Sequence, residues 1–379
     1  MTALSEDDLG LLRDTAARFF EEQLPLNALR KLRDDRDETG FDRGQWRAMA
    51  ALGWAGILIP QSYGGNALGF RALGNILEQS GRTLAATPFI STVLLGAPII
   101  AHAGSEAQRK DVLVAVASGE QILALALDET PRHAPHRIST RAVRHGDHYV
   151  IDGHKMFVLD GHVADRFVVV ARSTGDHNDR DGLSLFLVDA DTRGIRCTRT
   201  MMVDGRNAAN IEFEQVQIAA DALIGLPGAG FDTIEPVLDG ACAGLAAEML
   251  GTGLEAFDRT IEYLKTREQF GVPIGSFQAL KHRAAEMYCE IELTRSSVAA
   301  ALEALDNNAT AAPALVSLAQ VKACEMLELV SNEALQMHGG IGMTDEVDIG
   351  LFLKRARVAQ QILGDAIYHR ERYATLVGI

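Results

Sequence analysis

The chain has 379 residues, of which 47% are hydrophobic and 23% are charged, and its formal net charge is −15. This length and balance predict a globular protein of two or three domains. The strong negative charge argues against nucleic acid or an anionic membrane surface as a bulk partner. The cysteines show no Cys-x-x-Cys spacing, which favours reduced thiols in a cytoplasmic protein over disulfides or a zinc site; they are Cys197, Cys242, Cys289 and Cys324.

Residues 5 to about 120 have a helical period. Ser5 precedes three acidic residues, as a helix cap followed by an acidic first turn would. Apolar residues then recur at three- and four-residue spacing from Leu9 through Phe20. The first eight residues lack a basic segment followed by an apolar one, so we expect no secretory signal. We also expect no membrane span, because we find no apolar run near the roughly 20 residues that crossing a bilayer requires.

From about residue 122 to 226 the apolar period changes to two. Four segments alternate in the manner of strands, with turns supplied by Gly146, Gly153 and Gly182; they are residues 148–158, 166–171, 183–188 and 210–216. No helical pattern separates them, which favours an antiparallel β-domain over a βαβ fold. No Gly-x-Gly-x-x-Gly follows a strand, so a Rossmann NAD site is not expected.

After residue 227 the helical period returns. Three long segments, at 231–266, 277–306 and 313–337, carry alanine, leucine and methionine on one face and predict a helical bundle. The sequence therefore predicts an α+β protein of three domains. Its expected parts are an N-terminal helical domain at 1–121, a middle β-domain at 122–226 and a C-terminal helical bundle domain at 227–379.

Two segments at the ends of long helices offer groups that suit a flat, phosphate-bearing ligand. The first, 267–278, contains a guanidinium, an aromatic ring and a side-chain amide. A guanidinium fork matches phosphate oxygens. The second, 336–346, contains the pair Gly339–Gly340, where backbone can approach a ligand with no Cβ in the way.

These segments resemble the flavin-binding signature of the acyl-CoA dehydrogenase family, and the resemblance covers almost the whole chain. The chain resembles a divergent bacterial type of this family, similar to subunits of heteromeric sterol side-chain dehydrogenases. The resemblance implies a middle β-barrel-like domain, a C-terminal four-helix bundle that builds a dimer of dimers, and FAD at a site shared between subunits. By resemblance, FAD is contacted in one subunit by Arg267, Gln269, Phe270 and Gln278, with Arg267 on the pyrophosphate. The partner's flavin is approached by Gln336, His338, Gly339 and Gly340.

The first β-domain strand departs from the family. Relatives usually carry Thr-Glu-Pro and then Gly-Ser-Asp, whereas this chain reads Leu127-Asp128-Glu129-Thr130-Pro131 with no Gly-Ser-Asp after it. Leu127 and Phe157 are the expected flavin contacts here, with the Phe157 ring beside the flavin. Leu159 replaces a threonine and offers no hydroxyl to the flavin. Asp128 and Glu129 form either a solvated strand end or part of the site.

The catalytic base also departs from the family. Matching Arg355 to a family arginine places Gly364 at the usual glutamate position, and a minority of relatives place the glutamate where this chain has Ala241. Asp365 is the carboxylate left near the first position, with Gly364 allowing its turn to shift. Asp365 is therefore either the base or only the N-cap of a helix at 366–376. A chain without its own base would still function in a heterotetramer, with a partner supplying that group.

The resemblance implies an oxidoreductase that uses FAD to convert a saturated acyl-CoA to the trans-2-enoyl-CoA in lipid metabolism and fatty acid β-oxidation. We expect electron-transferring flavoprotein as acceptor, a homo- or hetero-tetramer, and a cytoplasmic location. We expect no dependence on metal, NAD or nucleic acid. Two alternatives remain: a non-catalytic partner subunit of a hetero-oligomeric dehydrogenase, and a flavin oxidase of the same fold.

Overall fold

The computed structural model describes residues 4–379, so the start of the expected N-terminal domain at residue 1 lies outside the described residues. Two compact units are formed by contacts within the chain. One consists mainly of Leu32–Gly69 and Ala86–Ala241, and the other of residues 4–31, Phe70–Ala85 and Cys242–Ile379. Both units draw on segments that are distant in sequence. This division into two units does not test the domain boundaries expected after residues 121 and 226, and those boundaries stay predictions.

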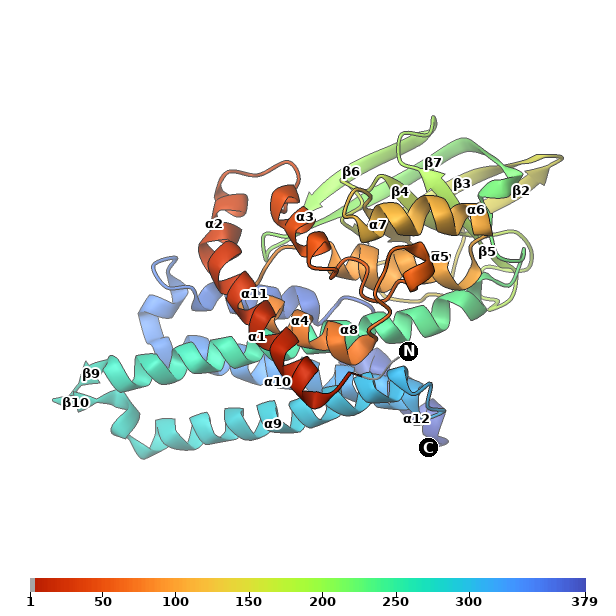
Figure 1. Ribbon diagram of the computed structural model, residues 1–379. Helices are drawn as coiled ribbons and strands as arrows, with labels where there is room; N and C mark the ends of the chain where they lie inside the picture. The colour runs from red at the N-terminus through yellow and green to blue at the C-terminus, as the bar shows by residue number, and fades with distance from the viewer. Residues whose placement is uncertain (1–3) are drawn as a thin grey trace. The chain divides into compact units, whose positions relative to one another are not determined.

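The helices lie mainly before and after the strands (Figure 1). The α-helices are α1 (Glu6–Gln23), α2 (Leu26–Asp34), α3 (Arg43–Ala51), α4 (Phe70–Arg82), α5 (Ala97–Ala103), α6 (Glu106–Gln108), α7 (Val114–Ala117), α8 (Gly230–Thr266), α9 (Gln278–Asp306), α10 (Ala312–His338), α11 (Ile349–Ala359) and α12 (Ala366–Val377). Shorter 3-10 or π segments are η1 (Gln61–Tyr63), η2 (Phe89–Gly96), η3 (Arg109–Leu113), η4 (Ala220–Ala222), η5 (Ile274–Ser276) and η6 (Gly339–Met343).

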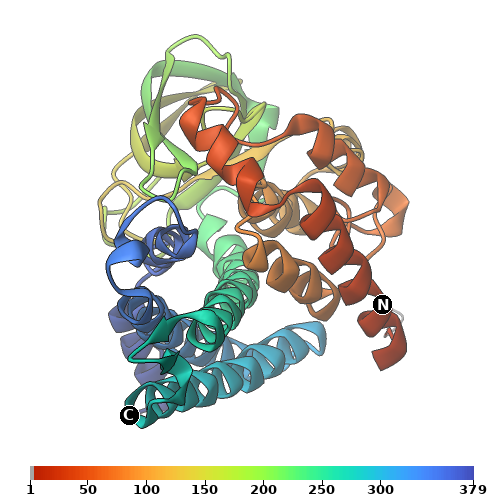
Figure 2. The same cartoon turned by 90° about the vertical axis from the view of Figure 1, so that its left-hand side faces the viewer.

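The strands of the first unit form a curved sheet, seen from two directions in Figures 1 and 2. They are β1 (Leu123–Ala126), β2 (Arg141–His145), β3 (His148–Leu159), β4 (Arg166–Arg172), β5 (Leu183–Asp189), β6 (Ile195–Met201), β7 (Asn207–Ala219) and β8 (Leu223–Ile224). The order is β6-β7-β3-β2-β4-β5-β8, with β1 paired to β4. The α+β class is confirmed, and most pairs are antiparallel as expected.

The sheet differs from the sequence prediction in the direction of β1 and in four strands that were not predicted, which are β1, β2, β6 and β8. β1 runs parallel to β4, with Leu123 opposite Arg166, whereas an antiparallel domain was expected. β1 was not predicted because all four of its residues are buried, and a short continuous apolar run has no strand period. β6, also not predicted, lies at the edge of the sheet and is mostly solvent-exposed, so it lacks an apolar alternation.

The second unit is helical. α9 packs against α10, α10 against α11 and α12, and α1 against α4. The hairpin of β9 (Glu268–Gln269) and β10 (Val272–Pro273) joins α8 to α9 at their far end (Figure 1). At the start of the unit, Ser5 caps α1 as predicted, because its hydroxyl accepts the Asp8 N–H while Asp8 bonds back to the Ser5 N–H.

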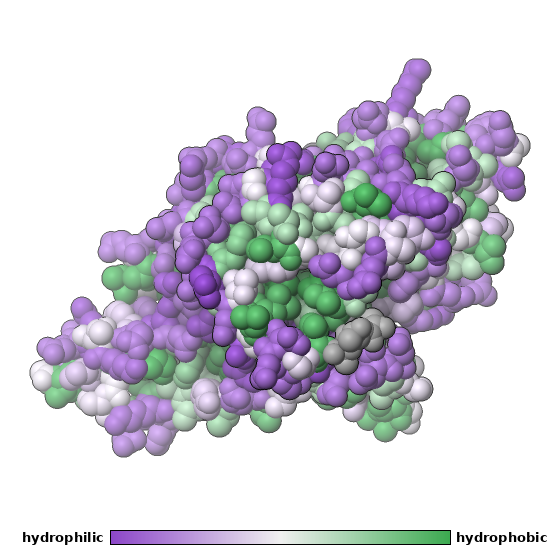
Figure 3. All heavy atoms as spheres, in the orientation of Figure 1, coloured by the Kyte–Doolittle hydropathy of each residue, from purple (hydrophilic) through white to green (hydrophobic). Residues whose placement is uncertain are grey.

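Among residues 4–379, one helix is long and apolar enough to cross a membrane by length and composition alone, and it is α8. Its apolar window is completely buried within the protein, which is also how a core helix behaves. The expectation that no segment spans a membrane therefore stays a prediction. Hydrophilic side chains cover much of the face shown in Figure 3, and hydrophobic residues form smaller patches.

Candidate functional site

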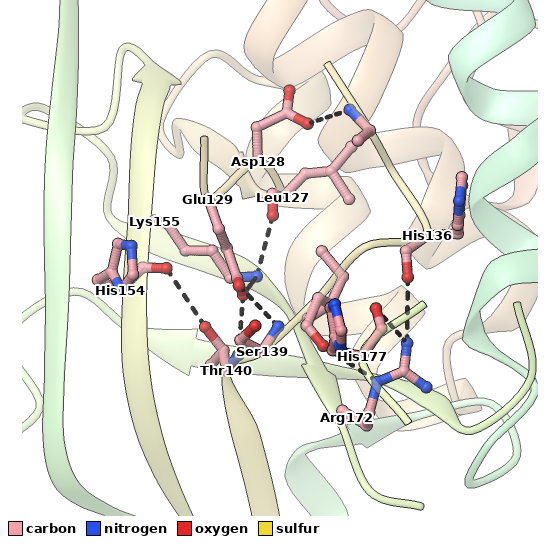
Figure 4. Close-up of polar contacts among 12 residues, drawn as sticks. Leu127, Asp128, Glu129, His136, Ser139, Thr140, His154, Lys155, Arg172 and His177 are labelled. Atoms are coloured by element: carbon pink, nitrogen blue, oxygen red, sulfur yellow. Dashed lines mark hydrogen bonds and ion pairs between the residues drawn. The ribbon is translucent and has the colours of Figure 1, made fainter. Parts of the chain in front are cut away.

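In the first unit, the segment that follows β1 is fixed by a buried ion pair. The Lys155 side chain is fully buried, and its Nζ donates to the Leu127 carbonyl oxygen at 2.9 Å and to Glu129 Oε1 at 2.8 Å (Figure 4). The Glu129 carboxylate also accepts the Ser139 N–H at 2.6 Å and the Thr140 N–H at 2.9 Å. One carboxylate thus ties three segments of the chain together.

This pair shifts the pKa values of both partners. Burial lowers the pKa of Lys155 to about 8, against the opposing attraction of Glu129. Burial alone would raise the pKa of Glu129, but the Lys155 charge and the hydrogen bonds from Lys155 and Thr140 outweigh it, so that pKa is lowered. The interpretation of Glu129 as a solvated strand end was therefore wrong, because the residue is only 8% exposed and its carboxylate is bonded on both sides. Asp128 is partly buried, and its carboxylate contacts His133 Nδ1 at 2.9 Å.

Phe157 has a strained backbone and an exposed ring. The pairing of β3 with β7 shifts register between Lys155 and Val158, a bulge that redirects the side chain. Phe157 takes a φ of +51°, a left-handed conformation that a phenylalanine rarely adopts, and its side chain is 49% exposed. The bulge is held in place because the neighbouring Met156 N–H donates to the Asp128 carbonyl oxygen at 2.7 Å and the Phe157 N–H donates to Asn210 Oδ1 at 3.3 Å. Strain that surrounding bonds maintain points to a functional position.

An open hollow of about 600 Å³ lies over the same strands. Its lining comes from β3 and β7, at residues 153–156, 210–212 and 214. The expected flavin contacts Leu127 and Phe157 thus belong to one hydrogen-bonded group of the first unit, because Lys155 bonds to the Leu127 carbonyl and the Lys155–Met156 peptide precedes Phe157.

In the second unit, the expected cofactor residues after α8 gather on one hairpin. Phe270 and Gly271 form its two-residue turn, and both have positive φ, at +54° and +78°. The Phe270 side chain is 91% exposed and meets the Phe277 ring edge-on, with 6.1 Å between ring centroids. Arg267, Gln269 and Gln278 are exposed beside it. The segment therefore presents a guanidinium, two amides and two rings to solvent.

The expected residues at the end of α10 divide into exposed and buried ones. Gln336, Gly339 and Gly340 are exposed, and a Cβ added at either glycine would meet nothing within 4 Å. His338 is buried, its Nδ1 lies 2.7 Å from the Ala334 carbonyl oxygen, and its ring stacks on Tyr263 at 4.3 Å. Burial lowers the pKa of His338. Its imidazole is thus an interior group, and a contact of His338 with a cofactor stays a prediction.

The turn before α12 contains the expected base. Asp365 is the N-cap of α12, and its Oδ1 accepts the Tyr368 N–H at 2.8 Å, which confirms the capping interpretation. Gly364 has φ +104°, and a Cβ there would lie 2.5 Å from the Tyr368 ring. Leu363 before it also has a positive φ of +59°, and its carbonyl oxygen lies 3.0 Å from His369 Nε2. The turn requires the glycine, whereas the role of Asp365 as a base stays a prediction.

A second buried ion pair, between α11 and α8, was not predicted. Arg355 of α11 contacts Glu248 Oε1 of α8 through Nε at 3.0 Å and Nη2 at 2.8 Å, and both side chains are under 5% exposed. Of the four charged residues in the two pairs, only Glu248 has apolar neighbours on both sides in sequence. That placement was the available signal for Glu248, because charged residues are almost never fully buried unless they are paired.

Family models for acyl-CoA dehydrogenase match nearly the whole chain. The N-terminal domain matches residues 6–120, the middle domain 130–216 and the C-terminal domain 228–376. A probable acyl-CoA dehydrogenase of Bacillus subtilis, YngJ, is 33% identical over 332 residues, which cover 86% of this chain and 87% of that protein. Cyclohex-1-ene-1-carbonyl-CoA dehydrogenase of Geobacter metallireducens is 32% identical, covering 83% of this chain and 84% of that protein.

Solved structures share the fold over their full length. A steroid ACAD, Tcur3481-Tcur3483, matches with a TM-score of 0.87 and 31% identity over 98% of both chains. The ChsE4-ChsE5 complex from Mycobacterium tuberculosis matches with a TM-score of 0.88 and 26% identity, covering 100% of this chain and 99% of the other. An acyl-CoA dehydrogenase from Geobacillus kaustophilus matches with a TM-score of 0.90 and 26% identity over 100% of both chains.

Proposed function

Because the chain belongs to the acyl-CoA dehydrogenase family of flavoprotein oxidoreductases, we propose that it uses FAD to convert a saturated acyl-CoA thioester to the trans-2-enoyl-CoA. The observation that carries this proposal is Phe157, an exposed ring on a strained backbone, held by a bulge that is bonded to the segment Leu127–Glu129. An aromatic face presented in this way suits a flat ring system, which stacks at an offset on its neighbours.

The residues present fit the chemical parts of FAD. Arg267 would hold the pyrophosphate, because an exposed guanidinium fork pairs with phosphate oxygens. Gln269, Phe270 and Gln278 lie around it on the hairpin and at the start of α9. Gln336, Gly339 and Gly340, whose backbone is open, would address the adenosine part of the cofactor in another subunit. When bound, FAD supplies an acceptor for the hydride that leaves the β-carbon of the acyl group.

The dehydrogenation also requires a group that removes the α-proton of the acyl chain, and we propose that Asp365 is this group. Its Oδ1 caps α12, and Oδ2 is then the oxygen to receive the proton. Gly364, with its positive φ, gives the turn a backbone conformation that other residues adopt only with strain.

Asp365→Asn tests the assignment, because asparagine keeps the cap but removes the basic oxygen. Loss of a general base typically lowers the rate about 10²–10⁴-fold. The measurement is single-turnover bleaching of the yellow protein by acyl-CoA without oxygen, together with FAD content. Glu371→Gln, an exposed change on the same helix, is the matched control. Equal rates in wild type and Asp365→Asn would eliminate Asp365 as the base.

A second candidate is a partner subunit that frames FAD but receives its base from another chain. It is favoured by the commitment of one Asp365 oxygen to the helix cap. The similarity of this chain to chains of the Tcur3481-Tcur3483 steroid ACAD and of the ChsE4-ChsE5 complex also supports this candidate. In this case neither wild type nor variant bleaches alone, and bleaching returns on mixing with a second dehydrogenase-like chain. This candidate would be refuted if acyl-CoA bleached the wild-type protein without any partner chain and if adding a second dehydrogenase-like chain did not change that bleaching.

We further propose an assembly of four subunits in the cytoplasm that passes electrons to an electron-transferring flavoprotein. One relative, from Acetobacterium woodii, is named as a subunit of a caffeyl-CoA reductase-Etf complex and is 29% identical over 92% of this chain. Sedimentation of the purified protein tests the number of subunits. Transfer of electrons from the acyl-CoA-reduced protein to a purified electron-transferring flavoprotein tests the acceptor.

A further inference from the structure

The Asp348 side chain does not make the helix-capping hydrogen bond that its position at the start of α11 would normally favour. Asp348 is the N-cap residue of α11, yet its side chain makes no cap hydrogen bond. Aspartate is among the best capping residues, and the cap contributes about 0.5–2 kcal/mol to a helix. Here the carboxylate instead contacts Arg30 through Oδ1 and Arg259 Nη1 through Oδ2, the latter at 3.1 Å. The arginine contacts therefore replace the cap.

Arg30 reaches this loop from a point 318 residues away in sequence. Its Nε and Nη2 each lie 2.8 Å from Asp348 Oδ1, and its Nη1 lies 2.9 Å from Asp345 Oδ2. The side chain is 17% exposed, so these charges are only partly screened by water. One guanidinium thus holds two carboxylates three residues apart on the same loop. We name the contacts among Arg30, Asp345, Asp348 and Arg259 the arginine clamp.

Further ion pairs connect the clamp to residues of α8 and α4. Arg259 of α8 also contacts Glu255 one turn earlier at 2.9 Å. Glu255 contacts Arg82 of α4 at 2.9 Å, and Arg82 contacts Asp258 at 2.7 Å. Charges of alternating sign therefore run from the loop through α8 to α4. A network of this kind fixes geometry better than an isolated surface pair.

The other end of the same loop is also anchored. The Tyr263 hydroxyl donates to the His338 carbonyl oxygen at 3.3 Å, and the Tyr263 ring stacks on the His338 imidazole. Between this anchor and the clamp lies the segment 339–344. It is mostly exposed, and its outward residues include the two open glycines and Met343, whose side chain is 77% exposed. The segment is therefore anchored at both ends, while most of its residues are exposed to solvent.

We infer that Arg30 is a positioning residue that, through Asp345 and Asp348, holds the segment 339–344 in the conformation that binds the adenosine part of FAD. The inference rests on the proposed function for the identity of the ligand. Arg30 itself does not touch the ligand. Backbone groups at Gly339 and Gly340 bind with the geometry that the clamp and Tyr263 impose, and pre-ordering a loop increases affinity because less conformational entropy is lost on binding.

Arg30→Gln removes the charge and the fork while keeping a polar side chain. Arg13→Gln is the matched control, because Arg13 is half-exposed on α1 and pairs only weakly with Asp14 at 3.8 Å. Two measurements are made on the full-length protein: amide hydrogen exchange of a peptide covering 339–348 without FAD, and the FAD dissociation constant by fluorescence. Charged hydrogen bonds contribute enough that we expect about tenfold faster exchange and about tenfold weaker FAD binding in Arg30→Gln. Arg13→Gln should match wild type in both.

The outcomes separate the clamp from the proposed function. Unchanged exchange in Arg30→Gln overturns the clamp, whatever happens to FAD. Faster exchange with an unchanged FAD dissociation constant overturns the positioning role. Wild type that binds no FAD refutes the proposed function and the ligand named here. If Arg30→Gln does not fold, Asp345→Asn removes one arm of the clamp from a side chain that is 59% exposed, and should change both quantities in the same direction by a smaller factor.

Discussion

Lys155→Met tests the buried ion pair between Lys155 and Glu129, which fixes the segment after β1 in the first unit. The change leaves Glu129 buried without its cation, although the N–H groups of Ser139 and Thr140 still bond to it. Breaking a buried ion pair by removing one partner costs about 3–5 kcal/mol. Because those two donors remain, we expect a loss near the lower limit, about 3 kcal/mol. The Leu127 carbonyl, which accepts from Lys155 Nζ, is released at the same time.

Urea unfolding followed by tryptophan fluorescence measures this loss. The two tryptophans of the chain, Trp46 and Trp54, are buried in the same unit as Lys155 and report on its unfolding. With a slope of about 2–3 kcal/mol per M of urea, a loss of about 3 kcal/mol lowers the midpoint by about 1–1.5 M. Lys110→Met is the matched control, since the Lys110 side chain is 70% exposed and solvent screens its pair with Glu106, so the change should hardly affect stability. Equal midpoint shifts in the two variants would refute the reasoning.

The pH dependence of the unfolding free energy provides an independent test of the same ion pair. Burial lowers the pKa of Lys155 to about 8, whereas in the unfolded chain the group keeps the ordinary lysine pKa of 10.5. Between these values unfolding takes up a proton, so the unfolding free energy of wild type rises with pH relative to Lys155→Met, by at most about 1.4 kcal/mol per pH unit. The contribution of Glu129, whose pKa is lowered, is lost as pH falls below 4.5. Parallel curves for the two proteins from pH 8 to 10.5 would contradict the assignment.

Three further changes test single residues. Arg267→Ala should weaken FAD binding by about 1.5–3 kcal/mol, the contribution of a charge-assisted hydrogen bond, and retention of stoichiometric FAD through dialysis would argue against this contact. Phe157→Asn should leave stability unchanged or raise it by up to about 1 kcal/mol, because asparagine tolerates a left-handed φ, while FAD binding weakens; thermal unfolding and FAD titration measure the two effects. Asp365→Ala should destabilise the protein by about 1 kcal/mol through loss of the α12 cap, whereas Asp365→Asn should not, and equal melting temperatures for both variants would speak against the cap.

Features that depend on neighbours in sequence were predictable from the sequence alone. The Ser5 cap of α1 and the Asp365 cap of α12 involve residues three apart, so local sequence specifies them. The long helices α8, α9 and α10 begin and end within a residue or two of their predicted bounds, because a sustained apolar period and flanking glycine or proline mark them. The long strand β3 was found in the same way. The overall class follows from these local patterns, whereas the family resemblance rests on the residues of the segments 267–278 and 336–346.

The tertiary structure decided the features whose partners are distant in sequence. Lys155 meets Glu129 across 26 residues, and Arg30 meets Asp348 across 318. A charged residue in an apolar run carries no signal of which distant carboxylate will pair with it, because the pairing is chosen when the elements pack. The parallel contact of β1 with β4 and the outward turn of Phe157 have the same origin, since each is set by a neighbouring strand rather than by the residue's own propensity. Local sequence therefore determines where the long helices and β3 begin and end, and packing determines which side chains meet, because burying a charge is tolerable only where the fold brings its counter-charge.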